Sequence, residues 1–122
     1  MNLDEVKQSL RGPMIPVITN LRDDLSVDHQ AIARNVGFVV EHGVVRGRGV
    51  LLAVGAGGDF PVLTVDERKQ VAKTIVEAAQ GTPVLIGAQD THPQVCIEMA
   101  RWAEEIGAYG IQLSPTYYYA ST

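Results

Sequence analysis

The chain has 122 residues, a hydrophobic fraction of 46% and a formal net charge of -4, which is typical of one globular domain with an ordinary core. Its lysines and arginines are scattered, so no basic face favours nucleic acid or an acidic membrane surface. Cys96 is the single cysteine, which excludes an internal disulfide, and no apolar run approaches the ~20 residues of a membrane span. We therefore expect a cytoplasmic protein without nucleic-acid or membrane partners.

Short apolar runs alternate with longer amphipathic ones along the chain. A short helix is expected first, over residues 3–10. Four apolar runs then predict strands at residues 14–19, 50–54, 84–87 and 110–114. Their lack of polar alternation is typical of parallel strands that are covered on both faces.

Two amphipathic helices are predicted between the first three strands. The first has apolar residues at helical spacing between an expected N-cap at Ser26 and a stop at Gly43. The second opens with Thr64 and Glu67 in the spacing of a capping box, and it ends at Gly81.

A third helix is predicted before the last strand. It carries Trp102 in an apolar stripe that we expect to be core, with Thr91 as N-cap and Gly107 as stop. Strand and helix thus alternate three times before a fourth strand. This order restricts the fold to an open doubly wound sheet or a barrel.

A glycine-rich loop, Gly55-Ala-Gly-Gly-Asp59, follows the second strand. Backbone amides without bulky side chains at a strand end form a natural pocket for an anion. A dinucleotide-binding turn would open a helix directly, yet residues 60–63 intervene here, and no Gly-Lys-Ser/Thr follows as in a P-loop. The loop therefore favours a small anionic substrate at the carboxyl edge of the sheet.

Five motifs in order along the chain carry a family resemblance. They are Pro16-Val-Ile-Thr19, Asp24-Leu-Ser-Val-Asp28, Gly55-Ala-Gly-Gly-Asp59, Phe60-Pro-Val-Leu-Thr64 with Glu67-Arg68, and Ser114-Pro-Thr-Tyr-Tyr118. Together they resemble the dihydrodipicolinate synthase / N-acetylneuraminate lyase family. The resemblance implies an α/β fold, the (β/α)₈ TIM barrel, in which a lysine forms a Schiff base with pyruvate or another 2-oxo acid. Aldol cleavage, condensation or dehydration follows, without a metal or cofactor.

The resemblance also implies roles for individual residues. Ala56, Gly57 and Gly58 fall where the family binds the substrate carboxylate, although the two hydroxyl side chains usual in that loop are missing here. Tyr117 falls on the family's catalytic tyrosine, which passes a proton to and from the substrate. Asp59 replaces the usual glutamate and is expected to brace the loop. No catalytic role is assigned to Thr19.

Length is the main departure from the family, because a complete barrel needs roughly 250 residues. We expect residues 1–122 to be the N-terminal half of a single TIM-barrel domain, with about four strands and three helices. The Schiff-base lysine is then expected beyond Thr122, because Lys7, Lys69 and Lys73 do not fall in the pocket. The resemblance further implies a homo-oligomer, dimer or tetramer. The alternative is a catalytically silent fragment or pseudo-enzyme with a scaffold or assembly role.

Overall fold

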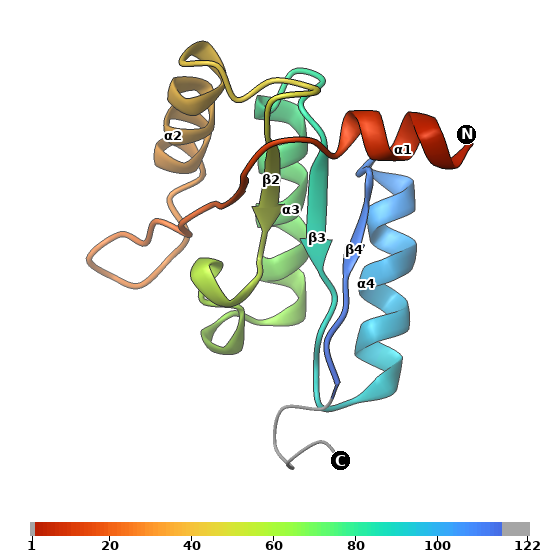
Figure 1. Ribbon diagram of the computed structural model, residues 1–122. Coiled ribbons are helices and arrows are strands. Elements are labelled where there is room, and N and C mark those ends of the chain that lie inside the picture. Colours follow the sequence, from red (N-terminus) through yellow and green to blue (C-terminus); the bar gives the residue numbers. More distant parts are fainter. Residues whose placement is uncertain (1, 116–122) are drawn as a thin grey trace.

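The computed structural model describes residues 2–115 and shows a parallel sheet with helices packed against it (Figure 1). The strands are β1 (Met14–Pro16), β2 (Val50–Ala53), β3 (Val84–Gly87) and β4 (Gly110–Gln112). The helices are α1 (Leu3–Ser9), α2 (His29–Glu41), α3 (Val65–Ala78) and α4 (Pro93–Glu105), with two 3₁₀ turns, η1 (Ala56–Gly58) and η2 (Phe60–Val62), after β2. Every predicted element is present, although β1, β2 and β4 end earlier than predicted. None of the helices within residues 2–115 is long and apolar enough to cross a membrane.

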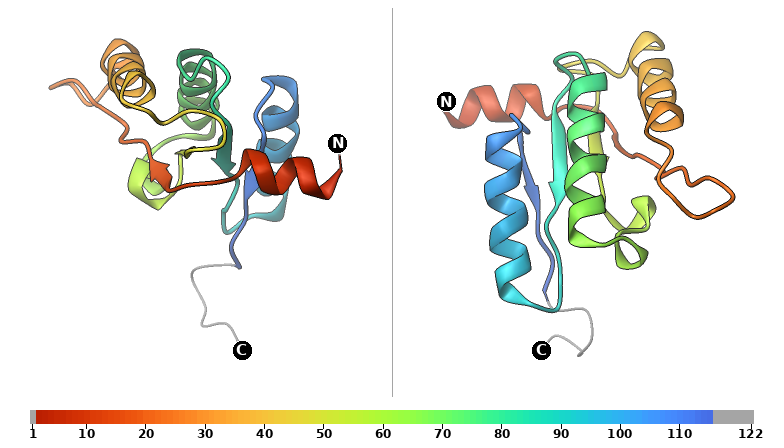
Figure 2. Two further views of the ribbon diagram at one scale, coloured as in Figure 1. Left: turned by 45° about the horizontal axis from the view of Figure 1, so that its top comes forward. Right: turned by 180° about the vertical axis from the view of Figure 1, so that it is seen from behind.

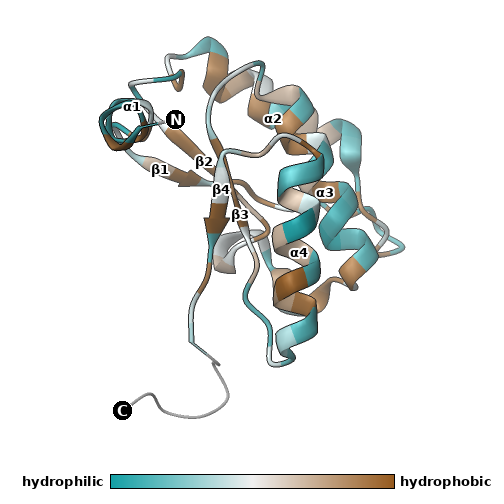
Figure 3. Cartoon of the chain, turned by 90° about the vertical axis from the view of Figure 1, so that its right-hand side faces the viewer, coloured by the Kyte–Doolittle hydropathy of each residue, from teal (hydrophilic) through white to brown (hydrophobic). Residues whose placement is uncertain are grey.

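The order of the strands decides between the two predicted architectures. The sheet runs β1-β2-β3-β4, and every neighbouring pair is parallel. Helices α2, α3 and α4 lie together on one face of the sheet, and α1 lies across the end where the strands begin (Figures 2 and 3). A doubly wound sheet would reverse its strand order and carry helices on both faces. The chain therefore forms part of a (β/α)₈ barrel, in which strands follow sequence order and helices stay outside.

The hydrophobic core lies between the sheet and these three helices. Strand residues that point toward the helices are fully or almost fully buried, and they pack with apolar residues of α2, α3 and α4: Leu51, Ala53, Val84, Ile86, Ile32, Val36, Val71, Ile75 and Met99. The opposite face of the sheet is less covered at its edge, where Met14 of β1 is 44% exposed. That face corresponds to the interior of a closed barrel.

The start of α2 differs from the prediction. Asp28, and not Ser26, is the N-cap, because its carboxylate accepts a hydrogen bond from the amide of Ala31 at 3.0 Å. Ser26 instead lies in the preceding turn, where its hydroxyl donates to the Asp24 carboxylate at 2.6 Å and its amide donates at 3.0 Å. These two bonds, the hydroxyl bond first, lower the pKa of Asp24 below its usual value.

The start of α3 agrees with the prediction, and the start of α4 differs from it by one residue. The capping box of α3 is confirmed: Thr64 Oγ1 accepts from the amide of Glu67 at 3.1 Å, and the Glu67 carboxylate accepts from the amide of Thr64 at 2.9 Å. In α4 the N-cap is His92, whose Nδ1 accepts from the amide of Gln94 at 3.1 Å. The prediction of Thr91 as the cap was wrong by one residue.

Trp102 is half-buried and joins two helices, whereas the sequence predicted a core position. Its indole N–H donates to the carbonyl of Lys69 at 2.8 Å, and the Lys69 ammonium lies 5.7 Å from the centroid of its ring. An indole combines an apolar ring with a polar N–H, so a half-buried position between two helices, with a backbone acceptor at hand, suits this residue. Trp102 thus fixes α4 against α3.

Candidate functional site

A residue with a left-handed backbone stands at each end of the glycine loop. Val54 directly follows the strand, is fully buried and has φ of 47°, and Asp59 at the end of η1 has φ of 56°. A positive φ is costly for a β-branched residue and persists only where the surroundings enforce it, often at functional sites. These two reversals hold the loop at the carboxyl edge of the sheet, below β2 in Figure 1.

Two amides of this loop are available to a ligand. The amide of Gly58 donates to the carbonyl of Gly55 at 3.0 Å, and the amide of Asp59 donates to the carbonyl of Ala56 at 3.1 Å. Ala56 and Gly57 are exposed, and their amides have no acceptor among the described residues. Adjacent unpaired N–H groups of this kind can bind a carboxylate. The amide of Gly58 already donates within the loop and is therefore not free for a ligand. The predicted binding role of Gly58 stays a prediction.

Strand β1 and the residues after it support the loop from one side. Thr19, only 6% exposed, donates from Oγ1 to the carbonyl of Gly58 at 2.7 Å. A Cβ added at Gly57 would lie 2.7 Å from Cβ of Pro16, so any larger residue would force the loop away from β1. Sequence reasoning left Thr19 without a role, although a hydroxyl at the carboxyl end of a strand was the available signal. The structure shows that it positions the glycine loop.

Strands β3 and β4 approach the loop from the other side. A Cβ added at Gly87 would lie 2.4 Å from the carbonyl oxygen of Val54 and 3.1 Å from Cα of Gly55. The side-chain oxygen of Gln112 on β4 would lie 3.6 Å from a Cβ added at Gly55. The carboxyl ends of three strands therefore meet at the start of the glycine loop.

Arg68 on α3 connects the end of β3 and the residues after it with the 3₁₀ turn η2. It is 1% exposed, and its guanidinium donates to the carbonyls of Gly87 at 3.2 Å and Gln89 at 2.9 Å. It also pairs with the Asp90 carboxylate at 3.1 Å, and its guanidinium carbon lies 5.1 Å from the ring centroid of Phe60 in η2. The planar fork of arginine suits this set of acceptors. The sequence placed Arg68 in a motif but gave no sign of this connecting role.

Two predicted site residues are placed differently or not at all. The side chain of Asp59 is exposed and makes no hydrogen bond with the described residues, so its visible contribution is its left-handed backbone, and Thr19 supplies the side-chain support. Tyr117 lies outside the described residues, and its role remains a prediction. Lys69 and Lys73 form ion pairs with Glu98 and Glu77 on the helices that cover the sheet.

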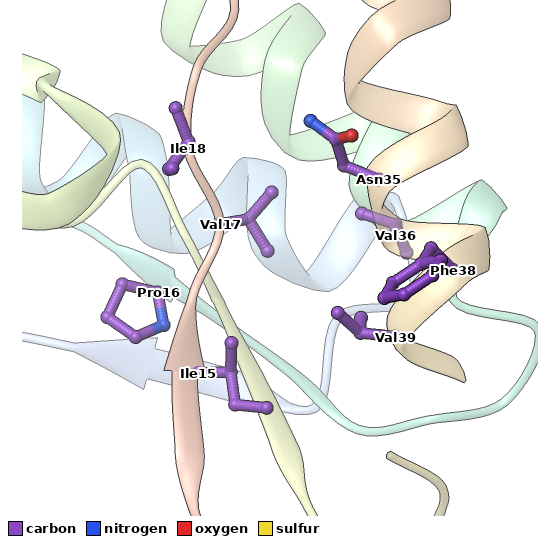
Figure 4. Close-up of a pocket in the computed structure, with 8 residues that line it drawn as sticks. All are labelled: Ile15, Pro16, Val17, Ile18, Asn35, Val36, Phe38 and Val39. Carbon is purple, nitrogen blue, oxygen red and sulfur yellow. The ribbon is translucent and has the colours of Figure 1, made fainter. Parts of the chain in front are cut away.

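No metal centre is formed within residues 2–115, since no three histidine, cysteine, aspartate or glutamate side chains gather there. A groove of about 400 Å³ runs between β1 and α2, with Ile15 and Val17 pointing toward the helix (Figure 4). Its lining is apolar apart from Asn35, and it adjoins the glycine loop through Pro16 and the backbone of Val17. The groove has the character of a packing surface at the sheet edge and lacks groups for catalysis.

The chain is similar to curated proteins that include a synthase and a dehydratase. A 4-hydroxy-tetrahydrodipicolinate synthase of Chlorobium chlorochromatii is 34% identical over 110 residues, which are 89% of this chain and 36% of that protein. A probable 5-dehydro-4-deoxyglucarate dehydratase of Methylobacterium radiotolerans is 37% identical over 100 residues, 82% of this chain and 32% of that protein. The chain thus spans about a third of the length of these curated relatives.

Solved structures agree with the sequence relatives. A prophage protein of the dihydrodipicolinic acid synthase family from E. coli K12, in complex with pyruvate, superposes with a TM-score of 0.82 at 29% identity, covering 91% of this chain and 36% of that one. A 2-keto 3-deoxygluconate aldolase from Picrophilus torridus gives a TM-score of 0.75 at 27% identity, covering 89% and 38%. The sequence model of the dihydrodipicolinate synthetase family matches residues 9–122. With this match and the shared partial barrel, the chain belongs to the dihydrodipicolinate synthetase family.

Proposed function

We propose that this chain supplies the carboxylate-binding part of a Schiff-base-forming lyase that acts on pyruvate or another 2-oxo acid. The observation that carries the proposal is the pair of exposed, unpaired amides at Ala56 and Gly57, held at the carboxyl edge of the sheet. Barrel enzymes place their active sites at this edge. A related solved structure is in complex with pyruvate, which supports a small 2-oxo acid as the ligand.

In this proposal the loop binds and orients the substrate. The amides of Ala56 and Gly57 hold the carboxylate, while Thr19 keeps the loop in place from β1. The neighbouring 2-oxo carbon is then attacked by a lysine amine, and loss of water forms the Schiff base. We place this lysine beyond Thr122, because Lys69 and Lys73 are ion-paired with Glu98 and Glu77 and Lys7 lies on α1. Tyr117 transfers protons to and from the bound substrate.

The absence of hydroxyl side chains at Ala56 and Gly57 narrows the choice among the family's reactions. Neither Ala56 nor Gly57 has a side-chain group that can move a proton, so the loop orients the substrate but takes no part in proton transfer. We therefore favour a dehydratase or a divergent aldolase over the biosynthetic synthase. A dehydratase and an aldolase among the similar proteins support this choice. For the full-length form we expect a cytoplasmic homo-oligomer.

Carboxylate binding is tested on the chain itself. Pyruvate is titrated into the 122-residue chain while backbone amide signals are followed by NMR. We expect the amides of Ala56 and Gly57 to shift, and methyl pyruvate, which lacks the carboxylate, to leave them unchanged. In Gly57→Ala the new methyl group meets Pro16 at 2.7 Å, so the response to pyruvate should be lost. Equal responses to pyruvate and methyl pyruvate would contradict the proposed carboxylate site.

The Schiff base is tested on the protein purified from its natural source. Incubation with pyruvate and borohydride reduces a Schiff base to a permanent adduct, which intact mass reveals. A gain of one reduced pyruvate on a lysine beyond Thr122 supports the lyase. The 122-residue chain is the matched control and should gain nothing. A natural protein that gains no adduct would favour the catalytically silent scaffold.

A further inference from the structure

The sheet formed within residues 2–115 has two open edges, at β1 and at β4. In β1 the amide of Val17 donates to the carbonyl of Leu52 at 2.9 Å, so this residue faces β2. Alternate residues of a parallel strand direct their backbone groups to opposite neighbours, so Met14 and Pro16 direct theirs away from β2. Pro16 offers only its carbonyl, because proline has no N–H. The outer side of β1 can therefore accept a further strand.

The apolar groove described above lies beside this open edge, between β1 and α2 (Figure 4). Two of the residues that line it are largely exposed, Ile18 at 62% and Phe38 at 60%. Single exposed apolar residues are common, whereas a contiguous apolar patch marks an interaction surface. The groove therefore suits apolar side chains from another element.

The open edge at β4 carries apolar side chains. Ile111 pairs in register with Ile86, which is fully buried in the core under the helices, so Ile111 points to the same face of the sheet. Ile111 is 38% exposed, and Leu113, two residues further on, is 59% exposed. One edge of the sheet thus has an apolar groove, and the other has apolar side chains that can fill it.

We propose that the 122-residue chain binds a second copy of itself through these edges, with β4 of each copy beside β1 of the other. Four strands are half of the eight in a closed barrel. A two-fold axis along the barrel keeps the direction of the strands, so two copies close into eight parallel strands. Ile111 and Leu113 of each copy then enter the groove of the other.

Closure in this form explains why β4 and not β1 is the partner of β1. Pairing of β1 with β1 would leave both β4 edges open, whereas pairing of β1 with β4 leaves no open edge in the sheet. The inference goes beyond the proposed function and does not depend on it, because the contact requires no 2-oxo acid. Failure to bind pyruvate would therefore leave it unaffected.

Size-exclusion chromatography with light scattering tests the proposal on the 122-residue chain. We expect twice the mass of one chain. Leu113→Lys and Ile18→Lys each place an ammonium group in an apolar contact, so each should halve the mass. Both side chains are largely exposed, so the circular dichroism spectra should not change. The matched control is Val62→Lys, which alters a 72% exposed residue outside both edges and the groove, and it should keep the mass of two copies.

A mixture of two variants tests which edges meet. Leu113→Lys and Ile18→Asp should each be monomeric alone. In a mixed dimer one contact is that of the parent chain, and the other brings a lysine near an aspartate, so an equimolar mixture should recover the mass of two copies. A mixture that stays monomeric would overturn the pairing of β4 with β1.

The other outcomes also decide the proposal. A parent chain with the mass of one copy would overturn it and would leave the edges to later strands of a longer polypeptide. A mass above two copies would overturn the closed form, because a closed barrel has no edge for a third copy. A dimer that Leu113→Lys leaves intact would overturn the role of β4.

Discussion

Arg68 is the side chain whose loss should disturb the site and the fold most. It is 1% exposed, and its guanidinium donates to the carbonyls of Gly87 and Gln89 and to the carboxylate of Asp90. In Arg68→Met these three acceptors lose their donor, while the volume of the side chain is largely kept. Removing one partner of a buried charged pair costs about 3–5 kcal/mol, because the groups left behind are unpaired.

We therefore expect Arg68→Met to lower the free energy of unfolding by about 3–5 kcal/mol. The side chain of Asp90 is 22% exposed, so water can replace part of the ion pair that Asp90 loses in the variant. The two unpaired carbonyls therefore account for most of the destabilisation. A domain of this size has a total stability of about 5–15 kcal/mol. The variant should thus be folded but marginal, with its urea midpoint lowered by on the order of 2 M.

Urea unfolding followed by circular dichroism measures this change. The matched control is Lys73→Met on the same helix, which removes an exposed ion pair with Glu77 at 4.0 Å and should cost less than about 0.5 kcal/mol. Arg68→Lys should recover little, because a single ammonium cannot reach three acceptors with the geometry of a fork. A free energy of unfolding for Arg68→Met that lies within about 1 kcal/mol of the value for the parent chain would refute the proposed role of Arg68.

Three further changes can be checked on the same chain. Thr19→Val should lower the free energy of unfolding by about 1–3 kcal/mol, because the buried carbonyl of Gly58 loses its donor, while Thr19→Ser should recover most of it; equal losses in urea unfolding would argue against the hydroxyl. Leu25→Gly should stabilise by about 0.5 kcal/mol in the same assay, because Leu25 is 73% exposed and has φ of 69°, a conformation that glycine adopts without strain; a lower stability would contradict this. Ser26→Ala should raise the pKa of Asp24 toward its ordinary value in an NMR titration, since the hydroxyl bond that lowers it is removed. With the lowered pKa, Asp24 contributes stability above its ordinary pKa and loses it as the pH falls through the lowered value, so the variant should lose that contribution, and an unchanged titration would contradict the assignment.

The sequence determined the elements of the fold because its local signals are strong. Apolar runs without alternation gave the four strands, and the predicted stops Gly43, Gly81 and Gly107 all have positive φ, between 78° and 108°. The capping box at Thr64 was also readable, since both of its hydrogen bonds are local. The family motifs then predicted the barrel, which the parallel order β1-β2-β3-β4 confirms.

Contacts between distant segments could be decided only by the tertiary structure. Thr19 and Gly58 are 39 residues apart, and Arg68 and Gln89 are 21 apart, yet each pair shares a hydrogen bond that shapes the site. Nothing local in the sequence requires these pairings, because they arise when parallel strands bring their carboxyl ends to one edge. The side-chain oxygen of Gln89 has no hydrogen-bond partner among residues 2–115, and this too depends on the tertiary structure, because it is decided by the segments that pack around the side chain.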